Sequence, residues 1–181
     1  MVTEAAPRPV SEAELADVRR SVENVMDPEV PVLTLGDLGI VRDVRVAEDE
    51  PGTVDVDLTP TYSGCPATEV IARMAADAVR RHGLRARVHT VLSPAWTTDW
   101  MSDEGHLKLK EFGIAPPTGK AAAGPVLVTT GMSIGRRPAD LVCPRCGSRD
   151  TNEVSRFGST ACKSLWQCRS CGEPFDHFKT I

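Results

Sequence analysis

The segment TPTYSGCPATE, residues 59–69, separates two patterns of different period and so decides how the first part of the chain folds. Before it, apolar and polar residues alternate over 53–59, which is the two-residue period of a half-buried strand. After it, apolar residues recur at helical spacing to about His82, and Gly83 suits the position just beyond a helix end. A strand is therefore expected to pass into a helix through a loop that ends at Cys65.

Cys65 is the first candidate functional residue. Pro66 suits the first position of a helix, which would place Cys65 at or next to the N-cap. Free backbone N–H groups and the helix dipole favour an anion there, and the thiolate is the form of cysteine that binds metals or attacks electrophiles. A lone cysteine can equally be a small buried apolar residue, and its position alone leaves both interpretations open.

Patterns on either side of this segment complete one α+β domain. Ser11 and Glu14 form a capping box, which starts a helix that the Asp27-Pro28 pair is expected to end. The expected elements are helices over 11–26, 66–82 and 102–112, strands over 40–46, 53–59 and 85–92, and an ordered loop over 27–39. The first two strands are expected to pair antiparallel. The predicted fold class is α+β, a small mixed sheet with helices on one face.

The last part of the chain has the cysteine spacing of a metal site. Two CxxC pairs, each followed by glycine, have the arrangement of rubredoxin-type knuckles, and the ligands would be Cys143, Cys146, Cys168 and Cys171. Two such knuckles supply four thiolates to one tetrahedral ion. Strands are expected over 152–156 and 163–167. Sulfur ligands suit zinc or iron, and a structural zinc is preferred because so small a β-ribbon has little core of its own.

Length and composition bound the possible functions. The 181 residues allow one ordinary domain and a small module, and we expect a disordered leader (1–9), an α+β domain (10–115), a linker (116–137) and a zinc ribbon (138–181). The formal charge of −4 gives no general attraction to nucleic acid. No apolar run is long enough to span a bilayer, and the N-terminus lacks a secretory signal, so a cytoplasmic protein with reduced cysteines is expected.

Several motifs together resemble the PaaD family, also called PaaJ, of the phenylacetate degradation system. They are DPEVPVLTLGDLGIV (27–41), TPTYSGCPATE (59–69), PAWTTDWMS (94–102), KEFGIAPP (110–117) and the cysteine-rich tail. The first domain resembles the iron–sulfur assembly domain of SufT-type proteins, whose hallmark positions match Asp27-Pro28-Glu29 and Cys65. The resemblance implies a maturation factor, and not an oxygenase, that helps to install an iron–sulfur cluster in the multicomponent phenylacetyl-CoA epoxidase.

Four residues are candidates for holding iron or a cluster: Cys65, Asp27, Glu29 and Thr61. The two acids would ligate iron or orient their neighbours, but Asp27 is also typical of a helix end and Glu29 of a solvated surface. Thr61 would donate a hydrogen bond to a cluster sulfur, although shaping the turn is the simpler role. A single thiolate cannot complete a cluster, so Cys65 would share one across a homodimer or with the recipient.

Two further groups carry alternative interpretations. Cys162, near the predicted ribbon turn, is either a further ligand for iron or a cluster or a free cysteine without a role, and it lies too far along the strand to join the four CxxC cysteines. The family that the chain resembles has a cysteine near the C-terminus where this chain has Thr180, so any role of a terminal thiol does not carry over. Trp96, Asp99 and Trp100 form either a partner-docking surface or a core plug with a capping acid.

Three functions compete. The first is an iron–sulfur carrier or maturation factor, with the oxygenase or reductase subunits of the epoxidase as partners. The second is a non-catalytic adaptor subunit that docks through the zinc ribbon and the Trp96–Trp100 loop. The third, a thiol enzyme, is disfavoured because the nearest histidines in sequence, His82 and His89, lie well beyond Cys65.

Overall fold

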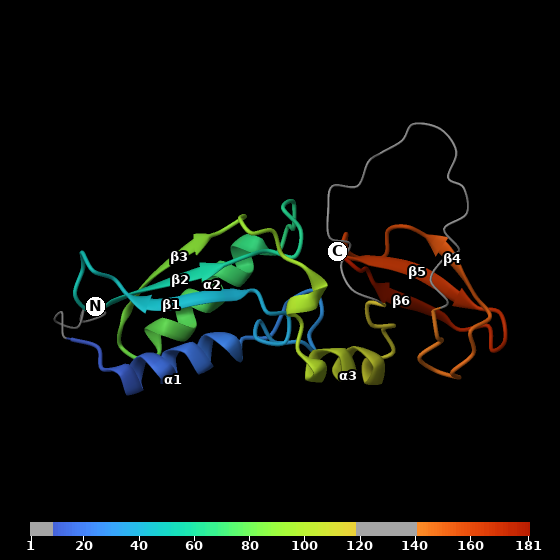
Figure 1. Ribbon diagram of the computed structural model, residues 1–181, viewed down its shortest axis with the longest axis horizontal. Coiled ribbons are helices and arrows are strands. Elements are labelled where there is room, and N and C mark those ends of the chain that lie inside the picture. Colours follow the sequence, from blue (N-terminus) through green and yellow to red (C-terminus); the bar gives the residue numbers. More distant parts are fainter. Residues whose placement is uncertain (1–8, 119–140) are drawn as a thin grey trace. The chain divides into compact units, whose positions relative to one another are not determined.

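The chain packs as two compact units (Figure 1). The computed structural model describes residues 9–118 and 141–181. The first unit runs to Trp96 and includes Trp100–Gly105, and the second contains Thr97–Asp99 and His106–Ile181.

Part of the predicted domain organisation lies outside the described residues. This applies to nearly all of the leader (1–9) and to most of the linker (116–137). The limits proposed for the two domains, 10–115 and 138–181, remain predictions. Among the described residues, no helix is both long and apolar enough to cross a membrane.

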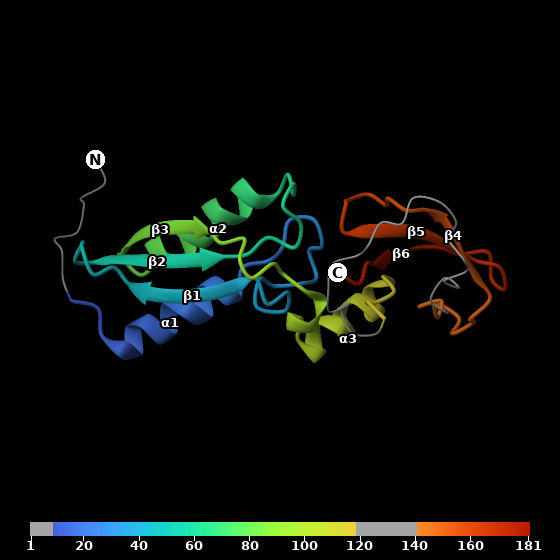
Figure 2. The same ribbon diagram turned by 45° about the horizontal axis from the view of Figure 1, so that its top comes forward.

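The first unit is built on a three-stranded mixed sheet (Figures 1 and 2). Its elements in chain order are α1 (Glu12–Glu23), β1 (Val41–Val46), β2 (Thr53–Leu58), α2 (Thr68–Arg80) and β3 (Arg85–Thr90). The central strand β2 pairs antiparallel with β1 and parallel with β3. A parallel pair needs a crossover connection, and α2 provides it. This arrangement confirms the predicted α+β class.

Helices α1 and α2 cover the apolar face of this sheet. Alternation along β2 places Val54 and Val56 on that face, and both are fully buried. The buried residues of the two helices are Val18, Val22, Ile71, Ala75, Ala76, Ala78 and Val79. Burying one valine side chain contributes roughly 1.5–3 kcal/mol to the stability of the folded domain. The buried apolar layer as a whole therefore fixes where β2 ends and α2 begins.

Helix α1 begins as predicted and ends earlier. The Ser11 hydroxyl accepts the Glu14 N–H at 3.2 Å, which is the N-cap bond expected from the capping box. The helix stops at Glu23, so the predicted end at Asp27-Pro28 was wrong. Met26, the last residue of the predicted helix range 11–26, lies beyond the observed helix and is 41% exposed.

The opposite face of the sheet carries charged side chains that pair with one another. Asp55 is the most enclosed, with 9% of its side chain exposed. Arg87 donates two hydrogen bonds to it, at 2.7 and 3.2 Å, and also pairs with Asp49. The Arg87 hydrogen bonds lower the pKa of Asp55 to about 2, against the smaller opposing effect of burial, and His89 adds a further lowering contact. This face is therefore held by ion pairs rather than by a second apolar layer.

The loop between α1 and β1 packs against the segment that follows β3. The Trp96 indole N–H donates to the Leu38 carbonyl at 2.8 Å, and only 4% of Trp96 is exposed. Gly39 has φ +65°, and a Cβ there would lie 2.2 Å from the Trp100 carbonyl oxygen. Trp96 is therefore a core residue and is not part of an exposed docking surface in this fold. Of the two interpretations given for it above, a docking surface or a core plug, its burial supports the core plug.

The second unit contains a three-stranded antiparallel ribbon. Helix α3 (Asp103–Phe112) precedes it, and its strands are β4 (Thr151–Ser155), β5 (Lys163–Cys168) and β6 (Pro174–Phe178), in that order across the sheet. The sequence predicted the first two strands to within one residue and did not predict β6.

Ala115 extends this ribbon sheet beyond β6. Its N–H donates to the Asp176 carbonyl at 2.8 Å, and its carbonyl accepts the Phe178 N–H at 2.9 Å. Ala115 forms a parallel bridge with His177 and is 2% exposed. The residues just after α3 therefore pack with the ribbon.

Candidate functional site

The four cysteines of the CxxC pairs converge on one point. All four sulfur atoms lie within 4.8 Å of one another. Cys143 Sγ is 3.9 Å from Cys171 Sγ, and Cys146 Sγ is 3.6 Å from Cys168 Sγ. A tetrahedron with zinc–sulfur bonds of about 2.3 Å has edges of about 3.8 Å. The donor set and its spacing therefore fit one tetrahedral metal ion.

Two equivalent turns place these sulfurs. In each, the carbonyl of the first cysteine accepts the N–H of the glycine after the pair, Gly147 or Gly172, at 2.9 Å. Both glycines have a positive φ, 75° and 76°. Glycine adopts this backbone conformation with little loss of free energy, whereas a residue with a Cβ would be strained by it. The first cysteine of each pair is buried and the second is exposed. Each turn thus presents one inner and one outer ligand.

The two buried cysteines, Cys143 and Cys168, are also part of the ribbon core. The residues that pack together are Ala115, Leu141, Cys143, Trp166, Cys168 and Phe175. So few apolar side chains give little hydrophobic stabilisation to a module of this size. An ion joining the two turns would supply what the core lacks.

Cys65 lies in a different setting, in a tight turn between β2 and α2. The N-cap of α2 is Ala67, two residues after Cys65. The Cys65 carbonyl accepts both the N–H and the hydroxyl of Thr68, at 3.2 and 2.9 Å, and its N–H donates to the Tyr62 carbonyl. The prediction that Cys65 stands at or next to the N-cap, with Pro66 first in the helix, was wrong because the chain makes this additional turn.

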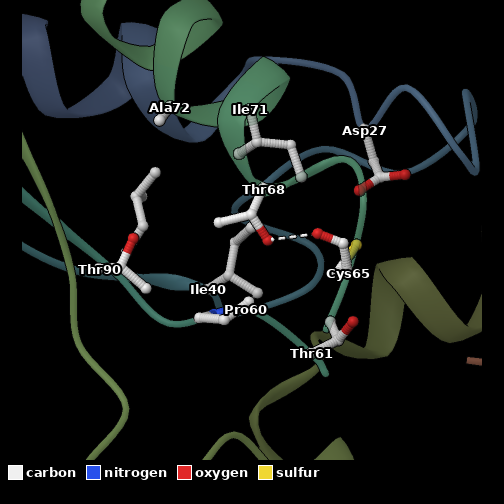
Figure 3. A pocket seen from close by; sticks show the side chains of 10 residues that line it. Asp27, Ile40, Pro60, Thr61, Cys65, Thr68, Ile71, Ala72 and Thr90 are labelled. Atoms are coloured by element: carbon white, nitrogen blue, oxygen red, sulfur yellow. Dashed lines mark hydrogen bonds between the residues drawn. The ribbon is translucent and has the colours of Figure 1, made fainter. Parts of the chain in front are cut away.

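The Cys65 side chain borders a small pocket (Figure 3). Its volume is about 30 Å³, which is room for about two water molecules. Figure 3 shows the side chains of Asp27, Thr61 and Cys65 at one end and those of Ala72 and Thr90 at the other. The remaining lining residues are Ile40, Leu58, Pro60, Thr68 and Ile71. Cys65 as a residue is partly exposed, and most of the residues that line the pocket beside it are apolar.

Two family models match the chain. One is described as an iron–sulfur cluster assembly protein and matches residues 15–92, and the other is described as the PaaD zinc beta ribbon domain and matches 130–179. The chain is also 44% identical over 161 residues to a putative subunit of the 1,2-phenylacetyl-CoA epoxidase of Escherichia coli K12, covering 88% of this chain and 89% of that protein. The chain belongs to the PaaD family. The sequence resemblance to this family is confirmed.

Other relatives cover about half of this PaaD-family chain. The Fe–S protein maturation auxiliary factor YitW of Bacillus subtilis is 34% identical over 95 residues, which is 51% of this chain and 90% of that protein. A crystal structure of the domain of unknown function DUF59 from Bacillus anthracis is 26% identical, with a TM-score of 0.49, and the match covers 54% of this chain and 92% of that one.

The structure brings together three of the four residues predicted to hold iron in this PaaD-family protein. Cys65, Asp27 and Thr61 border one pocket, and Glu29 is not among the lining residues. Asp27 is 7% exposed, and its Oδ1 accepts the N–H groups of Glu29 and Val30 at 2.8 and 2.7 Å. Asp27 therefore stabilises the turn after α1, separately from its predicted role in holding iron. The roles assigned to these residues remain predictions.

The other candidates lie elsewhere. Cys162 belongs to the second unit, where its sulfur is 3.1 Å from the Thr160 hydroxyl. Asp99 is exposed, and Trp100 is partly exposed with the Arg42 guanidinium 3.7 Å from its ring centroid. Docking through these two residues remains a prediction.

Sequence reasoning missed Thr68 as a determinant of the Cys65 turn. A threonine near the start of a helix is a known signal for side-chain bonding to the backbone, and it could have been read here. The apolar lining from Ile40 and Ile71 could not be predicted from the sequence, because it depends on how α2 crosses the end of the sheet.

Proposed function

We propose that this PaaD-family protein is an iron–sulfur cluster carrier that matures the multicomponent phenylacetyl-CoA epoxidase, holding iron or a cluster through Cys65. The match to an iron–sulfur assembly model and the similarity to an epoxidase subunit and to a maturation factor support this proposal. In it, the protein is not an enzyme. It acts in the cytoplasm, where its thiols stay reduced.

The observation that carries the proposal is the setting of Cys65. Cys65 is a partly exposed residue and lines a pocket together with Asp27 and Thr61, whose side chains carry a carboxylate and a hydroxyl. A pocket of about 30 Å³ has no room for a cluster of several iron and sulfur atoms. The cargo would therefore sit at the mouth of the pocket, bound by Cys65 on one side and open on the other.

An open site suits transfer. Iron–sulfur clusters usually take four protein ligands, so one thiolate leaves most positions for a second copy of this chain or for the recipient. Transfer is then a ligand exchange, in which a recipient thiolate replaces the Cys65 thiolate at iron and no electron changes centre. Tyr62, three residues before Cys65, is 50% exposed and offers an aromatic contact for the incoming protein.

We further propose that the ribbon holds a structural zinc ion through Cys143, Cys146, Cys168 and Cys171. Four thiolates leave no open coordination position, which is typical of structural sites. Zinc bound there would tie the two turns together, and the chain's own residues would only hold it. The partners of the protein are the oxygenase or reductase subunits of the epoxidase, with a homodimer as an alternative source of the second ligand set.

The alternative function is a non-catalytic adaptor subunit of the epoxidase complex. The closed ribbon site favours it, because a rigid metal-tied module can dock a partner without handling iron. Burial of Trp96 removes one residue of the docking loop that this alternative uses. The ribbon, Asp99 and Trp100 remain available to it.

Anaerobic reconstitution with iron and sulfide, followed by visible absorption and iron analysis, tests the carrier function. The full chain should take up iron, Cys65→Ser should lose that uptake while keeping its fold, and Cys162→Ser should behave as the parent chain. The carrier function is excluded if the parent chain takes up no iron yet still copurifies with the epoxidase, which is the adaptor outcome.

A further inference from the structure

Hydrogen bonds on both sides hold the backbone of Cys65. Its N–H donates to the Tyr62 carbonyl at 3.1 Å, and its carbonyl accepts the Thr68 N–H at 3.2 Å. A further bond comes from a side chain, because the Thr68 hydroxyl donates to the same carbonyl at 2.9 Å (Figure 3). A substitution at Thr68 can therefore remove this bond without changing the backbone groups that make the others.

The Thr68 hydroxyl serves the Cys65 turn rather than helix α2. A threonine that caps a helix accepts an N–H group of the first turn. Here the N-cap is Ala67, and the Thr68 hydroxyl donates in the opposite direction, to a carbonyl that precedes the helix. The helix itself is held by its buried face, which includes Ile71 and Val79. Loss of the hydroxyl should therefore loosen the turn more than the helix.

A fixed backbone matters for a residue that binds metal with one thiol. Fixing a ligand before it binds removes part of the entropic cost of binding. Removing an outer-shell hydrogen bond that orients a metal ligand typically lowers metal affinity about 10–100-fold. Thr68 also lines the pocket that Cys65 borders. One residue thus holds the backbone of the ligand and shapes the cavity beside it.

We propose that Thr68 positions Cys65 for metal exchange, and that its hydroxyl sets how long this chain retains iron before a recipient takes it. This inference rests on the proposed carrier function and adds to it a residue that contacts the ligand and not the iron. In the exchange, a recipient thiolate binds iron as the Cys65 thiolate leaves it, and the Thr68 hydroxyl keeps its proton throughout. Its effect is on the strength and geometry of one iron–sulfur bond.

Iron release from the full chain, reconstituted anaerobically with iron and sulfide, tests this role. Thr68→Val keeps the β-branched shape and the backbone N–H and removes the hydroxyl. It should release iron to a chelator about tenfold faster than the parent chain, which is the low end of the effect of outer-shell partners. Thr68→Ser keeps the hydroxyl and should release iron at the parent rate.

Ser21→Ala is the matched control for a general loss of stability in the first unit. It removes a hydroxyl that lies 2.8 Å from His82 Nε2, beyond the far end of α2. This variant should release iron at the parent rate. Visible circular dichroism of the bound iron gives a second comparison, because it depends on the geometry of the iron–sulfur bond. Thr68→Val should change that spectrum, whereas Thr68→Ser and Ser21→Ala should keep it.

The metal-free chain provides a measurement that does not depend on iron. Relaxation of the backbone ¹⁵N nuclei should show a more mobile Cys65 N–H in Thr68→Val than in the parent chain, and an unchanged one in Thr68→Ser. Equal mobility in all three chains would show that the hydroxyl does not fix the turn, and would overturn the proposal. Should Thr68→Val fail to fold, Thr68→Ala, a better helix former, makes the same comparisons.

Failure of this inference is distinguishable from failure of the carrier function. A parent chain that takes up no iron overturns both. Iron uptake by the parent chain with equal release from Thr68→Val overturns the positioning role alone. The same holds if Thr68→Ser, or the control Ser21→Ala, releases iron as fast as Thr68→Val.

Discussion

The two cysteine sites of this protein differ in how completely the chain surrounds a metal. In the ribbon, four sulfurs lie within 4.8 Å of one another, and two of them belong to the module's core. In the first unit, the partly exposed residue Cys65 offers one sulfur beside a pocket of about 30 Å³. A closed set of ligands retains its ion and supports the fold, whereas a single ligand leaves the metal open to exchange.

The largest effect should follow from opening the closed site. Replacing Cys168, which is fully buried, by serine removes an inner ligand and part of the core. Because binding of structural zinc contributes about 10–16 kcal/mol to zinc-finger folding, the ribbon should lose its ordered structure. Zinc analysis should fall from about one ion per chain to none, and NMR should show collapse of the signals of β4–β6.

Cys162→Ser is the matched control, since it changes a cysteine of the same module that is not one of the four ligands. It should keep its zinc and its ordered ribbon. If metal-free Cys168→Ser kept the same ribbon signals, the ribbon would not need its metal, and the contrast between the two sites would fail.

The next effect concerns Asp27, which borders the open site. Asp27→Ala leaves the N–H groups of Glu29 and Val30 without their acceptor, at a cost of about 2–3 kcal/mol in the free energy of unfolding of the first unit. Asp27→Asn keeps a side-chain carbonyl in place and should cost less. Denaturant unfolding of both variants measures this difference.

Iron uptake by the same pair of variants sharpens the comparison. Asp27→Asn should still fold, because its side-chain carbonyl can accept the same N–H groups. It should bind less iron than the parent chain if the Asp27 carboxylate is an iron ligand. Full iron uptake by Asp27→Asn would leave Asp27 with its structural role alone.

The features that the sequence predicted correctly depend on residues close together in the chain. The CxxC spacing is enough to name four ligands, because each turn is closed by bonds within six residues. The alternation of β2 and the helical spacing of α2 likewise predict one strand and one helix without reference to the rest of the molecule.

The features that were missed depend on distant segments. Strand β6 has Phe175, His177 and Phe178 all buried, so its pattern does not alternate, and its edge is covered by Ala115, which lies before the whole ribbon in the chain. The sequence left Trp96 open between a docking residue and a core residue, because the Leu38 carbonyl that accepts its indole N–H lies 58 residues away in the chain. The start of α2 was misplaced because Thr68 bonds back to Cys65 and delays the helix.

The smallest effect is a response to acid that belongs to the first unit. The folded pKa of Asp55, about 2, lies below the unfolded value of about 3.9. Its stabilising contribution is therefore fully present above about pH 4 and is lost as the pH falls toward 2. The loss should be about 1–2 kcal/mol, and Asp55→Asn should remove this pH dependence.

Unfolding of the first unit, followed by its own NMR signals between pH 5 and 2, measures this response separately from the ribbon. The ribbon loses zinc in acid for another reason, protonation of its thiolates. An unchanged acid slope in Asp55→Asn would show that the Arg87 pair does not stabilise the sheet.

In the function proposed above, one chain keeps one metal and passes on another. The most direct test loads the zinc-bound protein with iron and sulfide anaerobically, mixes it with an iron-free component of the epoxidase, separates the two and measures both metals in each. We expect iron to move to the recipient while about one zinc ion per chain stays behind. Iron that remains on this chain, or zinc that leaves with it, would show that the two sites do not divide these roles.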